Sequence, residues 1–340
     1  MRRASNNTLR DKYLGFHNPT QHFFESKNKL APSLPIIAVD IGSRNGPFDV
    51  DQLSSYSSFF CFEPNKDEFS KLTDKASKMS SPPACGELRH FPAAVCGHSG
   101  NTTLNVSRRP GATSTLEPNV EVLKHFAADH WSELADILKR ENVPAVTLPE
   151  FTKKAKLSHI DFLKLDTQGN ELDILKSSEE ILNNVGVVKV EVEFIQMYEG
   201  QALFDEVASY LRGKDFELID IEVVPACRRF HHFSRLRPSA YRLVWADLVM
   251  VRSPFDTSDS RLIAKAAVLA AMGYTDISCY MVRLAHGENE AFCKAFERMA
   301  LDMLKPKTWK SRFRSFLERK LGLLVSRYNW RTGQQVESLR

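Results

Sequence analysis

The stretch IIAVDIGSRNGPFDV, residues 36–50, constrains the fold more than any other part of the chain. A short apolar run ends in an acid and is followed by two glycines four positions apart, Gly42 and Gly46. Continuous apolar runs of this length are typical of strands that are covered on both faces, as in parallel sheets. Glycines directly after such a strand let the backbone turn sharply or approach a ligand closely. The stretch therefore predicts the first strand and ligand-binding turn of an α/β domain.

The rest of the chain repeats this alternation of strand and helix. Apolar runs recur at 59–63, 160–166, 185–194 and 243–251, and helical patterns follow residues 66, 168 and 202. Alternation of this kind predicts an α/β domain with a doubly wound, mostly parallel sheet and helices on both faces. We place this domain at 35–253, after a polar, basic leader at 1–34 and before a helical C-terminal extension at 254–340.

Two stretches interrupt the alternation. Residues 97–145 contain a polar segment and then a helical pattern at 121–140, and residues 223–242 form a basic loop between the last two expected strands. We expect both insertions to shape an acceptor pocket. Three arginines of the second insertion are candidates to bind an acidic or phosphorylated acceptor, namely Arg228, Arg229 and Arg235.

The glycine turn does not have the pattern of a dinucleotide site. That pattern needs a second glycine, G-x-G-x-x-G, so that the pyrophosphate can approach the backbone, and this chain has Arg44 at that position. S-Adenosylmethionine (AdoMet) has no pyrophosphate, and the spacing D-x-G-x-x-x-G matches the first loop of AdoMet methyltransferases. Glu63 ends the next apolar run, where an acid can accept hydrogen bonds from ribose hydroxyls. Together these features favour AdoMet over NAD.

Four motifs resemble those of the FkbM-type methyltransferases. They are VDIGSRNG, FEPN (62–65), FLKLDTQGNELDILK (162–176) and VEVEFIQMYEGQALFDEV (190–207), and the resemblance extends over about 36–252. It implies a seven-stranded Rossmann-like sheet and O-methylation with AdoMet. By position it also implies the cofactor-binding residues, which are Asp40, Gly42, Ser43, Arg44, Asn45, Gly46, Glu63, Pro64, Asn65 and Ala94, the last at the end of an expected third strand.

This chain departs from the family pattern at two places. Ser43 and Arg44 stand where many relatives have alanine and asparagine, so Arg44 is either a contact to the cofactor carboxylate or a solvated side chain. Gln168 stands where relatives often have an acid, which argues against a catalytic role for this residue.

Three residues are candidates for a catalytic role. Asp166 ends an apolar strand at the expected ligand crevice, although it could equally cap the helix that begins near Gly169. Glu193 shares one strand face with Glu191, and carboxylates inside a strand need a partner or a polar crevice. We assign Glu193 to the site and Glu191 to a structural ion pair. His232, in the basic loop, is a candidate general base that could instead be a surface residue.

Other chemistry is not indicated by the sequence. The [DNS]-P-P-[YFW] motif of amino-group methylation is absent, no carboxylate trio for a metal is recognisable, and the six cysteines form no C-x-x-C pair. We therefore expect a hydroxyl acceptor on a small molecule or glycan and no metal. Two other functions stay open: a NAD(P)-dependent oxidoreductase and a non-catalytic docking protein.

The charge is distributed unevenly along the chain. The net charge is only +4, but residues 305–331 are basic, with apolar residues at helical spacing. Such a helix either lies on an anionic membrane or packs its apolar side on the protein. No nucleic-acid-binding motif accompanies the charge. Without a recognisable signal peptide or spanning segment, we expect a cytoplasmic protein that is peripheral to the inner face of a membrane if the helix binds lipid.

Overall fold

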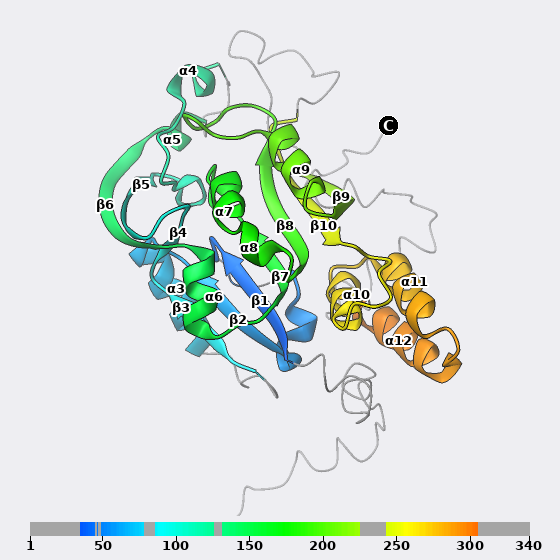
Figure 1. The fold of residues 1–340 in the computed structure, drawn as a ribbon. Coiled ribbons are helices and arrows are strands. Elements are labelled where there is room, and N and C mark those ends of the chain that lie inside the picture. Colours follow the sequence, from blue (N-terminus) through cyan, green and yellow to red (C-terminus); the bar gives the residue numbers. More distant parts are fainter. Residues whose placement is uncertain are drawn as a thin grey trace, which may run out of the picture.

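The computed structural model describes residues 35–44, 46, 49–77, 86–125, 131–224 and 243–304. Its centre is a seven-stranded sheet in the order β3-β2-β1-β7-β8-β10-β9 (Figure 1). The strands are β1 (Ile36–Ile41), β2 (Ser57–Phe62), β3 (Leu88–Phe91), β7 (Ile160–Leu165), β8 (Val185–Glu193), β9 (Phe216–Val224) and β10 (Trp245–Arg252). Strand β10 is antiparallel to both of its neighbours and the other pairs are parallel. The predicted Rossmann-like, mostly parallel sheet is confirmed.

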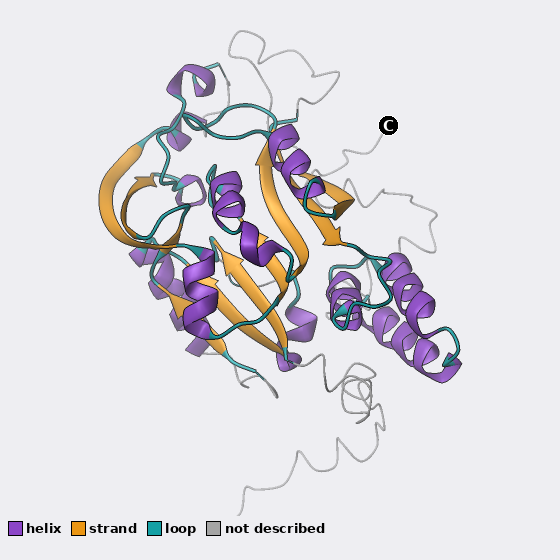
Figure 2. Ribbon diagram, viewed as in Figure 1, coloured by secondary structure: helices purple, strands orange, loops and turns teal. Residues whose placement is uncertain are grey.

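Helices cover both faces of this sheet (Figure 2). The face that includes Ile37 and Val39 packs against helices α6, α7, α8 and α9, and the face that includes Ile36 and Ala38 packs against α3 and the C-terminal helices. This arrangement explains why β1 is apolar without alternation, since all six of its residues are buried. The helices are α3 (Lys66–Ser77), α6 (Leu148–Ala155), α7 (Glu171–Ser177), α8 (Glu179–Leu182), α9 (Phe204–Arg212), α10 (Leu262–Ala271), α11 (Thr275–His286) and α12 (Glu290–Met303).

A second, smaller sheet, which was not predicted from the sequence, lies largely within the insertion at 97–145. Its strands are β4 (Ala94–Val95), β5 (Gly100–Ser107) and β6 (Ile137–Val146), in the order β4-β6-β5. Short helices lie between β5 and β6: η3 (Pro110–Ala112), α4 (Val120–Leu123) and α5 (Trp131–Leu134). A further short helix, η2 (Asp51–Tyr56), precedes β2.

The helical pattern expected over 121–140 is therefore wrong at its end, because residues 137–140 belong to β6. Strand β6 pairs with β5 in antiparallel register from Ile137↔Ser107 to Ala145↔Gly100. The hydrogen bonds of this long ladder override the local helical pattern, as tertiary pairing often does.

The third strand also ends earlier than expected. Strand β3 stops at Phe91, and Ala94 begins β4, which pairs with β6 in the second sheet. Pro92 separates the two strands, and proline has no N–H group to continue a ladder. The chain thus passes from the large sheet to the small one at this proline.

The C-terminal helices are joined to the large sheet by a buried ion pair. All ten residues of α10 are buried. Directly before it, Arg261 donates hydrogen bonds from Nε (2.9 Å) and Nη2 (2.5 Å) to the carboxylate of Asp161 in β7. The same carboxylate accepts the Ile37 N–H of β1 at 2.8 Å, so one buried side chain connects β1, β7 and α10.

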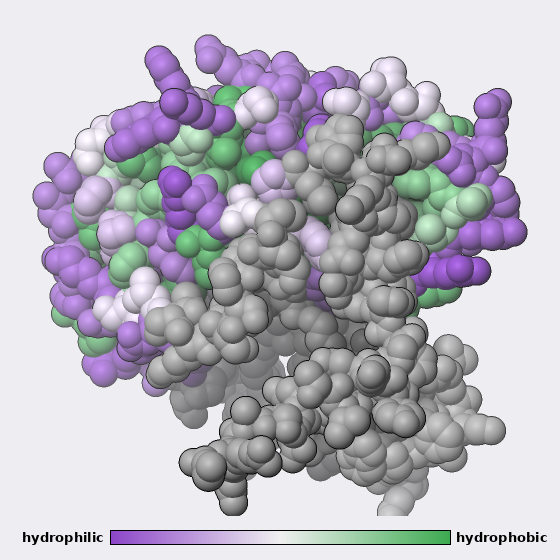
Figure 3. All heavy atoms as spheres, turned by 90° about the horizontal axis from the view of Figure 1, so that it is seen from below, coloured by the Kyte–Doolittle hydropathy of each residue, from purple (hydrophilic) through white to green (hydrophobic). Residues whose placement is uncertain are grey.

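Several predictions made from the sequence fall outside the described residues. These are the leader, the basic segment 305–331, the loop from 225 to 242 with His232, and the loop arginines Arg228, Arg229 and Arg235. Within the part of the chain that is described, no helix is long and apolar enough to span a membrane. On the face shown in Figure 3, hydrophilic and hydrophobic residues are interspersed over the described part of the surface.

We predict that Arg261→Met lowers the free energy of unfolding by about 3 kcal/mol, because it leaves the Asp161 carboxylate buried without its cation. The matched control is Arg89→Met, which breaks the exposed pair between Arg89 and Glu87 (2.7 Å) and should cost less than about 1 kcal/mol. Urea denaturation of both variants measures the difference. Equal losses would contradict a stabilising role for the buried pair.

Candidate functional site

The glycine turn after β1 is held tightly between two neighbouring strands. The N–H groups of Gly42 and Ser43 both donate to the carbonyl of Phe62 at the end of β2, at 3.1 and 2.9 Å. Gly42 has φ +84° and Gly46 has φ +96°, a region that favours glycine. A Cβ atom on Gly42 would lie 1.9 Å from the Asp166 carbonyl oxygen. The turn can therefore follow this path only with glycine at position 42.

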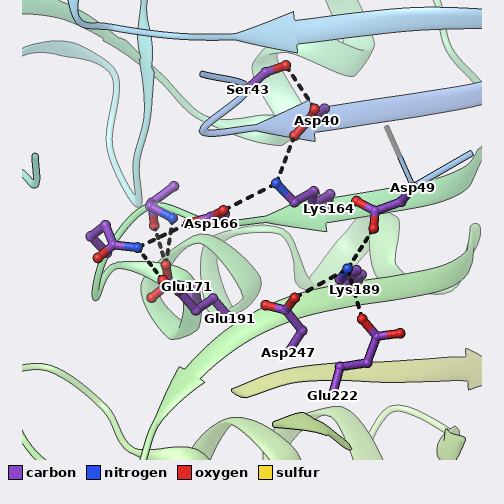
Figure 4. Close-up of polar contacts among 12 residues, drawn as sticks. Asp40, Ser43, Asp49, Lys164, Asp166, Glu171, Lys189, Glu191, Glu222 and Asp247 are labelled. Carbon is purple, nitrogen blue, oxygen red and sulfur yellow. Dashed lines mark hydrogen bonds and ion pairs between the residues drawn. The ribbon is translucent and has the colours of Figure 1, made fainter. Parts of the chain in front are cut away.

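A half-buried lysine joins the ends of β1 and β7 beneath this turn (Figure 4). Lys164 pairs in register with Asp40, and its Nζ lies 3.8 Å from Asp40 Oδ1 and 3.2 Å from Asp166 Oδ2. Burial opposes the charged form of Lys164, but the carboxylates of Asp40 and Asp166 outweigh it and raise the pKa of this lysine. Asp40 also accepts a hydrogen bond from Ser43 Oγ at 2.8 Å. Asp40 and Ser43 thus stabilise the turn without lining the cavity above it.

A cavity of about 310 Å³ opens above the turn. Six of the predicted cofactor residues line it, namely Gly42, Arg44, Gly46, Glu63, Pro64 and Ala94. Three others, Asp40, Ser43 and Asn65, are buried and do not line it, and Asn45 lies outside the described residues. Asn65 instead caps α3, since its Oδ1 accepts the N–H groups of Asp67 (3.0 Å) and Glu68 (3.3 Å). The cavity lies at the carboxyl ends of β1, β2 and β7, where α/β sheets bind ligands.

Glu63 is the acid of this cavity. Its Oε1 accepts the Asn65 N–H at 2.8 Å, while Oε2 accepts no hydrogen bond from any described residue. Burial raises the pKa of Glu63 to about 7, although the Asn65 N–H and Arg44 act in the opposite direction. Its ionisation therefore changes close to neutral pH.

The turn after β7 is organised by Glu171. This buried carboxylate accepts the N–H of Thr167 (2.7 Å), the hydroxyl of Thr167 (2.9 Å) and the N–H of Gly169 (2.9 Å). From the sequence, Asp166 was a possible cap for this helix. Glu171 instead binds the free N–H groups before α7. Asp166 instead faces the cavity and accepts hydrogen bonds from Lys164 and from Gln168 Nε2 (3.1 Å).

Gln168 connects the residues at the centre of the site. It adopts the left-handed conformation, with φ +61°, and its Nε2 also donates to Glu191 of β8. Tyr198 donates from its hydroxyl to Gln168 Oε1 at 3.2 Å and to the Ala112 carbonyl at 3.1 Å. Burial raises the pKa values of Glu191 and Glu193 well above the usual range, reinforced by Asp166 at Glu191 and by Glu171 at Glu193.

A second cavity, of about 510 Å³, adjoins the first. Five residues line both, namely Arg44, Pro110, Gly111, Gln168 and Glu191. The second cavity is further lined by Arg108, Arg109, Ala112, Glu133, Leu134, Glu193, Met197 and Trp245. We expected Glu191 to form a structural ion pair, but it lies at the junction of the two cavities. Glu193 lines only the second cavity.

A second lysine, which is buried, extends the polar side of the sheet (Figure 4). Lys189 of β8 lies beside Lys164 in the sheet register, and its Nζ is 2.6 Å from Asp49, 3.2 Å from Glu222 and 3.2 Å from Asp247. Asp49 lines the first cavity. Lys189 thus connects this side of the cavity to β9 and β10.

Sequence reasoning missed two residues of the site. Lys164 was read as part of an apolar strand, although a lysine in a buried strand is costly unless a carboxylate pairs with it, and this was a usable signal. Gln168 was set aside because relatives often have an acid there. Its contacts arise only when β7, β8 and the segment at 108–116 come together, so its spacing in the sequence carried no signal.

No group of three or more histidine, cysteine or acidic side chains is placed to hold a metal ion within the described ranges. The cysteines that the structure describes, Cys61, Cys96, Cys279 and Cys293, are free.

The sheet order, with an antiparallel strand inserted next to the last position, and the cavity at its carboxyl end define a Rossmann-like methyltransferase class. Residues 40–218 match the model of the methyltransferase FkbM domain, which covers more than half of the chain. The chain belongs to this family, whose methyl donor is AdoMet, so the predicted cofactor is confirmed and the oxidoreductase alternative is not supported.

Relatives with described activities are distant. The 2-O-methyltransferase NoeI of Sinorhizobium fredii (strain NGR234) is 23% identical over 201 residues, which are 54% of this chain and 78% of NoeI. Among solved structures, the magnesium protoporphyrin IX methyltransferase ChlM of Synechocystis PCC 6803, with bound SAM, has a TM-score of 0.33 and 8% identity over 74% of this chain and 87% of ChlM. Sp1610 of Streptococcus pneumoniae, a putative tRNA (m1A22) methyltransferase, has a TM-score of 0.29 and 10% identity over 92% of this chain and 94% of its own. The fold is assigned from the sheet topology itself.

We predict that Gly42→Ala lowers AdoMet affinity by more than about tenfold, because the new Cβ must displace the backbone at Asp166 and distort the turn. Gly100→Ala is a matched control, since Gly100 also has a positive φ (+120°) but a Cβ there meets nothing within 4 Å. Isothermal titration with AdoMet compares the two. If both variants bind AdoMet like the original protein, the close approach at Gly42 does not shape the cofactor cavity.

Proposed function

We propose that this methyltransferase transfers a methyl group to a hydroxyl of a sugar, glycan, glycolipid or natural product. The observation that carries the proposal is the meeting of two cavities at Gln168 and Glu191. Methyl transfer needs donor and acceptor in line and in contact, and holding the two together supplies a large part of the rate enhancement. In this proposal the first cavity holds AdoMet and the second holds the acceptor.

The residues of the first cavity fit AdoMet. Its volume lies at the lower end of the range of about 300–1,000 Å³ for small-molecule pockets. Glu63 has a carboxylate oxygen to which no described residue donates and which would accept the ribose hydroxyls. The backbone at Gly42 and Gly46 would lie beside the rest of the cofactor, and Ala94 would lie near the adenine. Bound AdoMet supplies an electrophilic methyl group on a sulfonium sulfur, and the protein contributes alignment and the removal of a proton.

Glu191 is the residue proposed to receive the acceptor's proton. It lies at the junction of the cavities, and a carboxylate whose pKa is raised is a stronger base than an ordinary one. The hydrogen bond from Gln168 fixes its position. Glu193 lines the proposed acceptor cavity, and Asp166 accepts a hydrogen bond from Gln168 and so holds it in place. The role predicted for His232 stays a prediction, because this residue lies outside the described ranges.

Two observations favour oxygen as the acceptor atom. The relative NoeI is by name a 2-O-methyltransferase, at 23% identity. The second cavity combines the apolar side chains Met197 and Trp245 with carboxylates and guanidinium groups, a mixture that suits a hydroxylated ring. We further propose a cytoplasmic protein; contact of the basic segment 305–331 with an anionic membrane stays a prediction, because these residues lie outside the described ranges.

We expect AdoMet affinity to fall as the pH falls through about 7, because protonation of Glu63 removes the carboxylate that accepts the ribose hydroxyls. Between pH 8 and pH 6, protonation of Glu63 should lower the affinity for AdoMet by about tenfold. AdoMet itself also titrates, so we compare Glu63→Gln with the original protein at each pH. The ratio of the dissociation constant of the variant to that of the original protein should be large at pH 8 and should shrink at pH 6. A ratio that is constant over this range would contradict the role of Glu63.

We expect Glu191→Gln to lower kcat by about 10²-fold or more, because the amide cannot accept a proton, while the AdoMet dissociation constant changes by less than about twofold. Glu290→Gln, an exposed glutamate of α12, is the control and should leave both constants unchanged. Stopped assays at saturating AdoMet measure kcat. A normal kcat in Glu191→Gln would remove this residue from the mechanism.

The function itself is tested by incubating the protein and methyl-labelled AdoMet with extracts and glycan fractions, followed by identification of the labelled species. Label in an alkali-stable methyl ether supports the proposal. Label only in esters, amines or nucleic acid would overturn it.

A further inference from the structure

One wall of the second cavity carries three guanidinium groups that the proposed methyl transfer does not require. Its guanidinium groups come from Arg44 in the glycine turn and from Arg108 and Arg109 in the segment between β5 and η3. We propose that this wall binds an oxyanion, a carboxylate or phosphate, on the same acceptor that presents its hydroxyl to Glu191. The proposal rests on the proposed function, because it takes the second cavity to be the acceptor site.

Arg108 and Arg109 are oriented for a second anionic partner. Arg108 donates from Nε to Asp136 Oδ2 at 2.6 Å, and Arg109 donates from Nε to Glu133 Oε2 at 2.9 Å. A guanidinium group has five N–H donors, and in each arginine only Nε is used by a described residue. The carboxylates therefore fix the two guanidinium planes while the terminal nitrogens stay available for the paired hydrogen bonds that carboxylates and phosphates accept.

Both ion pairs are exposed enough for exchange with a ligand. The side chains of Arg109 and Glu133 are 41% and 39% accessible, and those of Arg108 and Asp136 are 54% and 44% accessible. Exposed pairs of this kind contribute little to stability, so an incoming anion does not have to disrupt a stable structure.

Arg44 adds a third cation at the junction of the two cavities. Its side chain makes no hydrogen bond or ion pair with any described residue, and its guanidinium packs against the backbone at Gly111, where a Cβ would lie 3.3 Å from Nη2. Because Arg44 lines both cavities, it can contact either the donor or the acceptor. Tests of acceptor recognition therefore use Arg108 and Arg109, which line only the second cavity.

The opposite wall holds the carboxyl groups of Glu191 and Glu193. Glu191 accepts a hydrogen bond from the Gln168 amide, and burial raises the pKa of Glu193, which favours its neutral form. The remaining lining includes the apolar side chains of Leu134, Met197 and Trp245, the Gln168 amide, and the Glu133 carboxylate, which is paired with Arg109. The cavity thus suits a ring with an apolar face, a hydroxyl at one end and an oxyanion at the other, as in a uronic acid or a sugar phosphate.

The experiment measures anion binding without relying on methyl transfer. Phenylglyoxal modifies accessible arginines, and peptide mass spectrometry reports the extent of modification at Arg108, Arg109 and the control Arg89. The protein, saturated with S-adenosylhomocysteine, is treated at constant ionic strength with glucuronate, glucose 6-phosphate or neutral glucose. Arg89 is a matched internal control, because it forms a similarly exposed pair with Glu87 outside both cavities.

We expect the two anionic sugars to slow modification of Arg108 and Arg109 at least about fivefold, while Arg89 is unaffected and glucose protects neither. Stronger protection by glucuronate indicates a carboxylate acceptor, and stronger protection by glucose 6-phosphate indicates a phosphorylated one. Equal protection by glucose, or no protection by either anion, would overturn the inference.

A double variant provides the second arm. Arg108→Gln with Arg109→Gln should weaken binding of the protecting anion about tenfold by isothermal titration and leave the AdoMet dissociation constant within about twofold, whereas Arg89→Gln should change neither. Unchanged anion binding in the double variant would also overturn the inference. The two proposals fail separately: absence of a labelled methyl ether contradicts the O-methylation, and absence of anion binding contradicts only the acceptor class.

Discussion

The rest of the site depends on the ion pairs that Lys164 forms with two carboxylates. A cation in a strand covered on both faces persists only when carboxylates compensate it, and here they come from the ends of two parallel strands, Asp40 and Asp166. The pairing explains why polar residues interrupt otherwise apolar strands at this position. It also holds the carboxyl end of β1 against that of β7, so that the glycine turn lies directly over the Asp166 carbonyl.

The two cavities are built by different parts of the chain. The first is formed largely by the turns at the carboxyl ends of strands in the seven-stranded sheet. The second is formed largely by the segment after β5, by α5 and by the residues that follow β8. In the proposed function, the turns of the sheet recognise the donor and the segment between β5 and β6 recognises the acceptor, and both lie within the family match.

The sequence predicted the central strands well because their burial on both faces leaves continuous apolar runs, as in β1, β7 and β8. It failed at β6, whose residues 137–140 read as helix and become strand only through pairing with β5. The glycine turn and Glu63 were visible because they follow strands at fixed spacing. The role of Gln168 could not be predicted from the sequence, because its contacts join segments that are distant in the chain. It contacts Asp166 after β7, Glu191 in β8 and Tyr198.

The position of β10 sets the limits of the unit that can fold. The family match ends at residue 218, yet β10, at Trp245–Arg252, lies between β8 and β9 in the sheet. A chain that stopped at the end of the match would lack the strand that joins β9 to the rest, and Asp161 would lose Arg261. The segment that identifies the family is thus shorter than the smallest segment expected to be stable, and an excised domain would have to extend through α10.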